Sequence, residues 1–207
     1  MMVNPVIVLG SGNRHKGVEM SEIFAPAGIV IQTLADLPEH IDVVEDGNSF
    51  EENAIKKATE QARFLNRWTI AEDSGLSVVA LNGAPGIYSA RYSGSEATDE
   101  KNNDLLLENL KDVPLEKRNA WYTCFMVLSD PDGKVRFKTE GRCCGRITFE
   151  RRGHNGFGYD PLVEIVEYHK TFGELEPSVK RAISHRARAT RQFIPVLINL
   201  IDRGELT

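Results

Sequence analysis

The chain has 207 residues, of which 41% are hydrophobic and 27% are charged, and this composition is that of an ordinary globular protein with a sizeable core. The formal net charge of −5 excludes a general electrostatic attraction to nucleic acid as the main function. No apolar run is long enough for a signal sequence or a membrane span, so we expect a soluble, cytoplasmic protein without a membrane partner.

The beginning of the chain predicts a strand, a helix and a second strand. The apolar run Val6–Leu9 is typical of a strand buried on both faces, and it leads into the turn Gly10–Asn13. A helical stretch that carries Ile23 and Phe24 follows, and Ile29–Ile31 predicts the next strand. This order of elements is the start of an α/β domain.

The next elements are a capped helix and a short strand. Ser49 and Glu52 form a capping box, with Ser49 as the N-cap and Glu52 reaching back to it. The apolar residues of this helix fall on one stripe: Ala54, Ala58, Ala62 and Leu65. Thr69–Ala71 predicts a short buried strand that ends abruptly at the acidic pair Glu72-Asp73.

The middle of the chain predicts a helix and a hairpin. Thr98 is a typical N-cap, and the helix that follows it turns leucines inward at positions 105, 106 and 110. Trp121–Leu128 and Val135–Thr139 flank the turn Ser129–Gly133, which is a strong hairpin signal.

The chain ends in a predicted helix from Pro177 onward, broken or kinked near Pro195. No repeat or long linker separates the segments, so we expect a single domain over residues 1–207. Its fold class is α/β, with a mixed central β-sheet flanked by helices.

The loop Ser11–Lys16 is the first candidate site. A small turn between a buried strand and a helix exposes backbone N–H groups that favour an anion, and Lys16 adds a positive charge. The loop lacks the later glycines of a Walker A loop or a dinucleotide fingerprint. A β–α turn that requires glycine explains the same residues, so the loop alone leaves both interpretations open.

The acidic pair Glu72-Asp73 is the second candidate. Two carboxylates at the end of an apolar strand need water, a counter-ion or a metal, and Mg²⁺ prefers oxygen ligands. The alternative is a solvated turn in which Asp73 caps the next segment. Glu45 lies in an acidic turn and is a second candidate ligand, although a plain turn explains it equally well. Asn53 and Lys57 share one face of the capped helix, where an exposed lysine is usually a solvated charge.

Two further segments have a ligand-binding character. Gly153–Pro161 interleaves glycines with aromatic residues, which favours close approach to a ligand and stacking on a base, or a lid folded on the core. Lys180–Arg191 is basic in an acidic protein, which is typical of a solvated helix face and also suits a polyanion. Within it, His185 and Arg186 could donate to the edge of a base.

In this order, the segments resemble the Ham1-like inosine triphosphate pyrophosphatase family. The matching stretches cover nearly the whole chain: Ser11–Lys16, Ser49–Ala54, Glu72–Leu76, Gly83–Tyr92, Gly156–Pro161 and Ser184–Arg186. Each motif alone is weak, and the ordered set is highly specific.

The resemblance implies a fold and an activity. The fold is an elongated, two-lobed architecture shared with Maf-like proteins, with the active-site cleft between the lobes. The activity is Mg²⁺-dependent hydrolysis of ITP, dITP and XTP to the monophosphate and pyrophosphate, with one or more ions per subunit. It removes these non-standard purine nucleotides before they are incorporated into DNA or RNA. The resemblance also implies a homodimer without a stable nucleic-acid partner.

The resemblance assigns a role to each matching residue. Asp73 is the proton acceptor and, together with Glu45, a metal ligand. The residues that hold the triphosphate are Ser11, Gly12, Asn13, Arg14, His15, Lys16 and Lys57. The other substrate contacts are Ser74, Phe157, Gly158, Tyr159, Asp160, Lys180, His185 and Arg186. Of these, His185 and Arg186 are the candidate donors to the 6-oxo group of the base.

Two departures from the family pattern affect these assignments. Glu72 stands where bacterial relatives often carry Asp, and His154-Asn155 replaces the small residues that often precede the glycine–phenylalanine pair. A Maf-like pyrophosphatase acting on pyrimidine or modified nucleotides is the rival enzyme, and a non-catalytic nucleotide-binding module is the rival from another class. The segments at Phe157–Asp160 and Ser184–Arg186 argue against the first, and the three carboxylates Glu45, Glu72 and Asp73 against the second.

Overall fold

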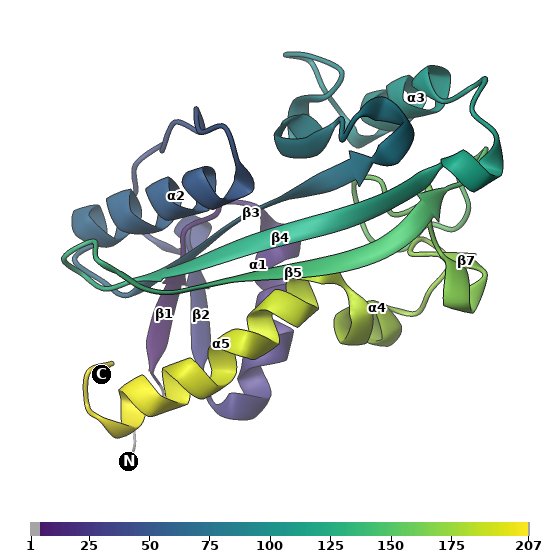
Figure 1. The fold of residues 1–207 in the computed structure, drawn as a ribbon. Coiled ribbons are helices and arrows are strands. Elements are labelled where there is room, and N and C mark those ends of the chain that lie inside the picture. Colours follow the sequence, from purple (N-terminus) through teal and green to yellow (C-terminus); the bar gives the residue numbers. More distant parts are fainter. Residues whose placement is uncertain (1–4, 207) are drawn as a thin grey trace. The chain divides into compact units, whose positions relative to one another are not determined.

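The computed structural model describes residues 5–206 and has a mixed α/β fold (Figure 1). One seven-stranded sheet has the order β2-β1-β3-β4-β5-β6-β7. The strands are β1 (Val6–Leu9), β2 (Val30–Thr33), β3 (Thr69–Val78), β4 (Asn119–Ser129), β5 (Val135–Ile147), β6 (Val163–Ile165) and β7 (Lys170–Thr171). The helices are α1 (Arg14–Phe24), α2 (Phe50–Leu65), α3 (Asp99–Asn109), α4 (Pro177–Ile183) and α5 (His185–Asp202). The predicted mixed sheet with flanking helices is confirmed.

The sheet combines parallel and antiparallel pairs. The first strand, β1, pairs in parallel with both β2 and β3, which requires the crossover helices α1 and α2. At the other edge, β6 pairs in an antiparallel sense with β5 and β7. Within residues 5–206 no helix has the length and apolar character needed to cross a membrane.

The chain divides into two compact units, each built from separate segments. The first unit takes the chain through Asp73, then Cys124–Gly141 and everything from Arg186 onward. The second unit takes Ser74–Thr123 and Arg142–His185. The two-unit organisation agrees with the predicted pair of lobes.

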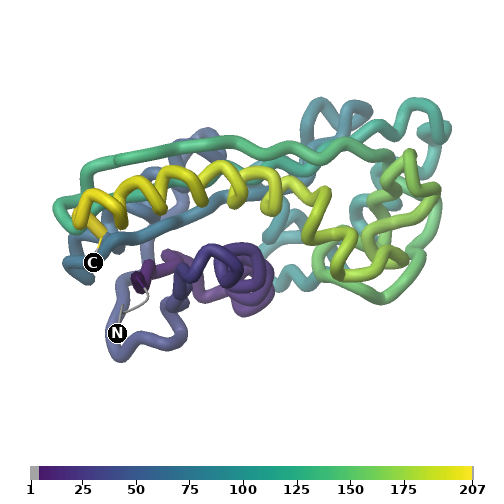
Figure 2. The backbone as a smooth tube through the Cα atoms, turned by 90° about the horizontal axis from the view of Figure 1, so that it is seen from below, coloured from purple at the N-terminus to yellow at the C-terminus, as the bar shows by residue number. Residues whose placement is uncertain are grey.

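In the first unit, helices cover both faces of the sheet (Figures 1 and 2). Cys124 and Met126 of β4 belong to a buried cluster with side chains of α1 and α5, including Phe24 and Phe193. Val127, the residue directly after Met126, belongs to a second cluster with the alanines of α2. Successive strand residues point to opposite faces, so α1 and α5 lie on one face and α2 on the other.

The same alternation continues along β3 and corrects one prediction. Ile70 packs on the α1 and α5 face, and Ala71 packs on the α2 face. The strand does not end at the acidic pair, because β3 runs from Thr69 to Val78. Glu72 and Asp73 are strand residues, so their side chains point to opposite faces of the sheet.

The ends of the predicted helices are largely confirmed. Ser49 caps α2 by accepting the Glu52 N–H at 3.1 Å, and Thr98 caps α3 by accepting the Lys101 N–H at 3.2 Å. The carboxylate of Glu52 accepts from the N–H of Asn48 rather than from that of Ser49, so the predicted capping box is only half formed.

The predicted C-terminal helix breaks at another place. Helix α4 ends at Ile183, Ser184 adopts an extended backbone with ψ of 157°, and α5 begins at the next residue. Pro195 lies inside α5, where Phe193 and Leu197 are fully buried on either side of it. Core packing therefore outweighs the tendency of proline to end a helix. The chain passes from the second unit to the first just after this break, between His185 and Arg186.

Arg118 stabilises the second unit from inside its core. It is only 1% exposed and donates to three backbone carbonyls, those of Leu110, Val113 and Thr148, at 2.6–2.9 Å. Leu110 is the C-cap of α3, so the guanidinium adds a charged donor, beside the N–H of Val113, to a carbonyl at the negative end of the helix dipole.

We expect Arg118→Met to lower the free energy of unfolding by about 3 kcal/mol or more, because it removes three hydrogen bonds from a buried charged donor, each worth roughly 1.5–3 kcal/mol. Urea unfolding followed by circular dichroism measures this. The control is Lys111→Met, since Lys111 is exposed and forms only a surface ion pair with Glu108. Equal urea midpoints for the Arg118 variant and the wild type would contradict the structural role.

Candidate functional site

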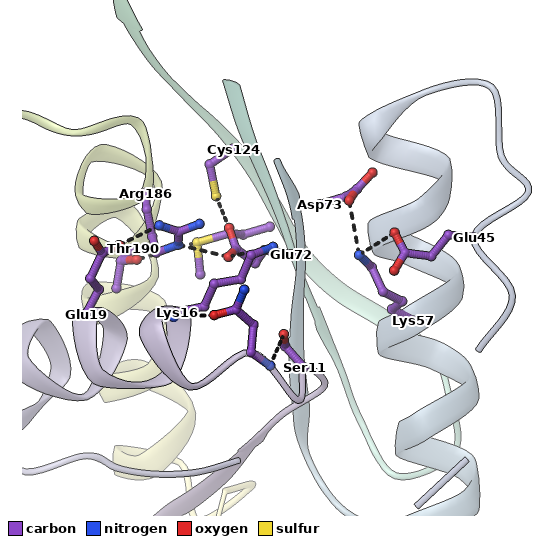
Figure 3. A network of polar contacts seen from close by, with 12 residues as sticks. Ser11, Lys16, Glu19, Glu45, Lys57, Glu72, Asp73, Cys124, Arg186 and Thr190 are labelled. Atoms are coloured by element: carbon purple, nitrogen blue, oxygen red, sulfur yellow. Dashed lines mark hydrogen bonds and ion pairs between the residues drawn. The ribbon is translucent and has the colours of Figure 1, made fainter. Parts of the chain in front are cut away.

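Glu72 is the centre of a buried ionic cluster on one face of β3 (Figure 3). Its carboxylate contacts Arg186 Nε at 2.8 Å and Lys16 Nζ at 3.3 Å. The thiol of Cys124 donates to it at 2.6 Å. Burial opposes ionisation of this fully buried group, but the charges of Arg186 and Lys16 outweigh it and hold the pKa of the carboxyl well below its usual range.

The cluster explains why the strand continues through an acidic pair. A buried carboxylate is tolerated when opposite charges and hydrogen bonds surround it. Arg186 is 1% exposed and also pairs through Nη1 with Glu19 of α1. Its guanidinium thus has two carboxylate partners that the sequence did not reveal, and its contact with a base stays a prediction.

Asp73 faces the other side of β3, toward α2 (Figure 3). Its Oδ1 accepts from Lys57 Nζ at 3.1 Å, and its Oδ2 accepts from Asn53 Nδ2 at 3.1 Å. Lys57 Nζ also donates to Glu45 Oε2 at 3.0 Å. The structure therefore brings together the predicted residues Glu45, Lys57 and Asp73.

The two carboxylates of this group differ in burial. The side chain of Asp73 is 9% exposed and that of Glu45 is 38% exposed. Burial raises the pKa of Asp73, and the charge of Lys57 and the hydrogen bond from Asn53 only partly offset it. Burial also opposes ionisation of Glu45, but there the charge of Lys57 outweighs it and lowers the pKa. A carboxylate with a raised pKa is the better proton acceptor.

Asn53 is a site residue that the sequence did not single out beyond its shared helix face with Lys57. While its Nδ2 contacts Asp73, its Oδ1 accepts from the N–H of Gly47 at 2.8 Å. A Cβ on Gly47 would lie 2.7 Å from this Oδ1, so only glycine permits the approach. Asn53 therefore ties the acidic turn that carries Glu45 to the strand that carries Asp73.

The residues of this group fit a divalent cation. The ammonium of Lys57 already lies between Glu45 and Asp73, so the two carboxylates converge on a positive charge. Residues 5–206 contain no group of three or more His, Cys, Asp or Glu side chains that could hold a metal. Two carboxylates suit an ion such as Mg²⁺, which keeps most of its ligands as water and phosphate oxygens.

The loop Ser11–Lys16 joins β1 to α1, as predicted. Asn13 is the N-cap of α1 and accepts the N–H of Lys16 at 3.2 Å, and Ser11 Oγ accepts the N–H of Asn13 at 3.2 Å. Gly12, Arg14 and His15 are exposed, and a Cβ on Gly12 would meet nothing within 4 Å. The loop is open to solvent, while Lys16 reaches back to Glu72.

The second unit holds a separate group centred on Asp160, which is 3% exposed. Its Oδ2 accepts from Lys180 Nζ at 2.6 Å and from the N–H of Phe157 at 2.9 Å. Lys180 Nζ also lies 4.5 Å from the centre of the Phe157 ring, in a cation–π arrangement. The predicted residues Phe157, Asp160 and Lys180 are therefore in mutual contact.

Tyr122 completes this group and was missed by the sequence reasoning. Its ring stacks on His185 with centroids 4.6 Å apart, and its hydroxyl donates to Asp160 Oδ1 at 3.3 Å. In the sequence it is one apolar position of an alternating strand, which is the pattern of a core residue. Nothing in that pattern distinguishes it.

The aromatic residues of the loop Gly153–Pro161 have different environments. Tyr159 is 5% exposed and donates to the carbonyl of Ser89 at 2.7 Å, so it is a core residue. Phe157 lies against Lys180 instead. Asn155 is one of the two residues that depart from the family pattern. It donates to the carbonyl of Leu175 at 3.0 Å and so fixes this loop to the segment that carries Leu175. Ser74, the remaining predicted contact, follows Asp73 on β3.

The sequence model of the Ham1 family matches residues 7–196, and the chain belongs to this family. The chain is 57% identical to the dITP/XTP pyrophosphatase of Rhodopirellula baltica over 95% of this chain and 94% of that protein. Among solved structures, a HAM1 protein from Coxiella burnetii matches with a TM-score of 0.85 and 37% identity, over 94% of this chain and 99% of that one. The Ham1 protein of Staphylococcus aureus matches with a TM-score of 0.82 and 39% identity, over 94% and 98%.

We expect Glu72→Gln to lower the free energy of unfolding at pH 7 by about 3–5 kcal/mol, because it removes the charge that balances the buried Arg186. The stabilisation by Glu72 is fully present above its ordinary pKa of 4.5 and is lost as the pH falls toward its lower pKa in the folded state. The difference in the free energy of unfolding between the wild type and the variant therefore becomes smaller below pH 4.5. Urea titrations at several pH values measure it.

The control for this experiment is Glu51→Gln, which removes an exposed partner of Lys138. We expect no measurable change in stability for that variant, because exposed ion pairs contribute little. A Glu72 variant as stable as the wild type at pH 7 would show that the cluster does not balance charge as described.

Proposed function

We propose that this chain hydrolyses dITP, ITP and XTP to the nucleoside monophosphate and pyrophosphate. The observation that carries the proposal is the convergence of Asp73, Lys57 and Glu45 on one face of β3 in a member of the Ham1 family. Relatives with that printed activity match nearly the whole chain. The family match spans both units, so we propose that residues 1–207 act as a single catalytic domain.

In this proposal the residues of the first unit bind the triphosphate and activate water. The loop Ser11–Lys16 presents N–H groups and the ammonium of Lys16 to the phosphates. Lys57 supplies a second positive charge, and Asp73 orients and deprotonates the water that attacks the α-phosphorus. Mg²⁺, held by Glu45 and Asp73, would neutralise charge on the phosphate oxygens.

Another set of residues recognises the base. Hypoxanthine and xanthine carry a 6-oxo group, where adenine carries an amino group, so a buried donor distinguishes them. We propose His185 and Arg186 as these donors and Phe157 with Lys180 as further contacts. Tyr122 holds the ring of His185 by stacking and Asp160 by a hydrogen bond, so it positions both.

The biological role follows from the chemistry. Removing dITP, ITP and XTP keeps altered purines out of DNA and RNA, and we place this activity in the cytoplasm, where these nucleotides are made. We further propose that the chain works as a homodimer and has no stable nucleic-acid partner, in keeping with its net charge of −5.

We expect Asp73→Asn to lower kcat by roughly 10²–10⁴-fold, because it removes the proton acceptor, while nucleotide binding stays measurable. Pyrophosphate release measures the first effect, and calorimetric titration with ITP measures the second. The matched control is Asp46→Asn, which alters an exposed carboxylate paired with Lys56 in the same region. Near-normal turnover by the Asp73 variant would refute its assigned role.

The substrate assignment is tested with ITP, XTP, dITP, GTP, ATP and dUTP, each with and without Mg²⁺. We expect pyrophosphate from the first three and discrimination against ATP of roughly 10⁴-fold, because adenine leaves the donors unpaired. Release of orthophosphate, or equal rates with ATP, contradicts the proposal. Preference for dUTP would instead indicate a Maf-like enzyme.

A further inference from the structure

Two side chains at the start of α3 hold the backbone of Gly158 from both sides. Asp99 Oδ2 accepts the N–H of Gly158 at 2.7 Å. Asn103 Nδ2 donates to the carbonyl of the same residue at 3.0 Å. Asp99 and Asn103 are four residues apart, so they lie on one face of the helix. Both polar groups of a single loop residue are thus fixed by one rigid element.

Gly158 connects α3 to the group around Asp160. It has a φ of +62°, a left-handed conformation that glycine adopts readily. It directly follows Phe157, whose N–H and ring contact Asp160 and Lys180. A shift of Gly158 therefore moves the Phe157 ring and the carboxylate that holds Lys180.

The amide of Asn103 is poorly explained by stability alone. The residue is 3% exposed, and its Oδ1 has no hydrogen-bond partner among residues 5–206. A buried carbonyl without a partner destabilises the fold, whereas an apolar side chain of similar shape does not. The neighbouring Asn102 differs, because it accepts from Ser93 and donates to the carbonyls of Ser89 and Ala90.

We propose that Asp99 and Asn103 are positioning residues that set the affinity and base selectivity of the nucleotide site through Gly158. Their contacts are with Gly158, in the loop that carries Phe157, so in this proposal they act on the base end of the substrate and not on the reacting phosphate. The proposal rests on the assignment of Phe157 and Lys180 to base recognition.

A positioning role and a purely structural role of Asn103 predict different changes in kcat and KM. A contact made equally in the ground state and the transition state changes KM and leaves kcat unchanged. A purely structural contact changes the fraction of folded enzyme, which lowers the apparent kcat and leaves KM unchanged. The split between KM and kcat therefore separates positioning from stability.

The experiment compares Asn103→Leu, Asp99→Ala, Asp99→Asn and the control Asp104→Asn with the wild type. Asp104 lies on the same helix, and its carboxylate pairs with the exposed Arg151. The measurements are hydrogen exchange of a peptide that spans residues 156–160, and kcat and KM for ITP and GTP. Asp99→Asn keeps an oxygen that can accept from Gly158, so it is the conservative rescue of Asp99→Ala.

In Asn103→Leu and Asp99→Ala we expect the amide hydrogens of residues 156–160 to exchange faster. We also expect the KM for ITP to rise by about tenfold while kcat stays within about twofold of the wild type, and the selectivity for ITP over GTP to fall. Asp99→Asn and Asp104→Asn remain near the wild type. Because Leu removes the unpaired Oδ1 together with Nδ2, the Asn103 variant keeps its fold.

Unchanged exchange and KM in Asn103→Leu overturn the inference, and so does a fall in kcat at constant KM. A wild type that releases no pyrophosphate from ITP contradicts the proposed function separately. In that case faster exchange in the Asn103 and Asp99 variants still establishes that these residues fix the backbone of Gly158. The claim about base selectivity is then overturned.

Discussion

The alternation of side chains along β3 determines how the first unit uses its acidic pair. Thr69 and Ile70 pair with β1 in a fixed register, so Glu72 must point toward α1 and α5 while Asp73 points toward α2. One carboxylate becomes a buried counter-ion and the other a partly hydrated group beside Lys57. A slip of one residue would exchange their environments, placing the proposed proton acceptor, Asp73, among cations that suppress its basicity.

The two units stabilise buried carboxylates by different means. In the first unit, Glu72 has two cationic partners and a thiol donor. In the second, Asp160 accepts from Lys180 and from two neutral donors, the N–H of Phe157 and the hydroxyl of Tyr122. Lys180 also lies over the ring of Phe157, so one ammonium joins a buried carboxylate to an aromatic ring.

The sequence predicted what depends on local signals and missed what depends on distant partners. The turn after β1, the cap at Ser49 and the β4–β5 hairpin follow from residues a few positions apart. The continuation of β3 past Ala71 did not follow, because the charges that make Glu72 tolerable come from residues far away in the chain. Tyr122 was missed for the same reason, and Asn53 was placed only on a helix face with Lys57, since the contacts of both appear only after folding. The break at Ser184 was placed at Pro195, because local propensity favoured proline and tertiary packing did not.

The partners of Glu72 also have a consequence for the order in which the protein matures on the ribosome. Lys16 emerges before Glu72, Cys124 well after it, and Arg186 only near the end of synthesis. Until α5 docks on this face, the carboxylate of Glu72 lacks its guanidinium partner and stays hydrated, because burial beside Lys16 alone would leave it incompletely neutralised. The nascent chain therefore closes this core last, and a polypeptide released before α5 is made lacks the residue that lets the acidic strand stay buried.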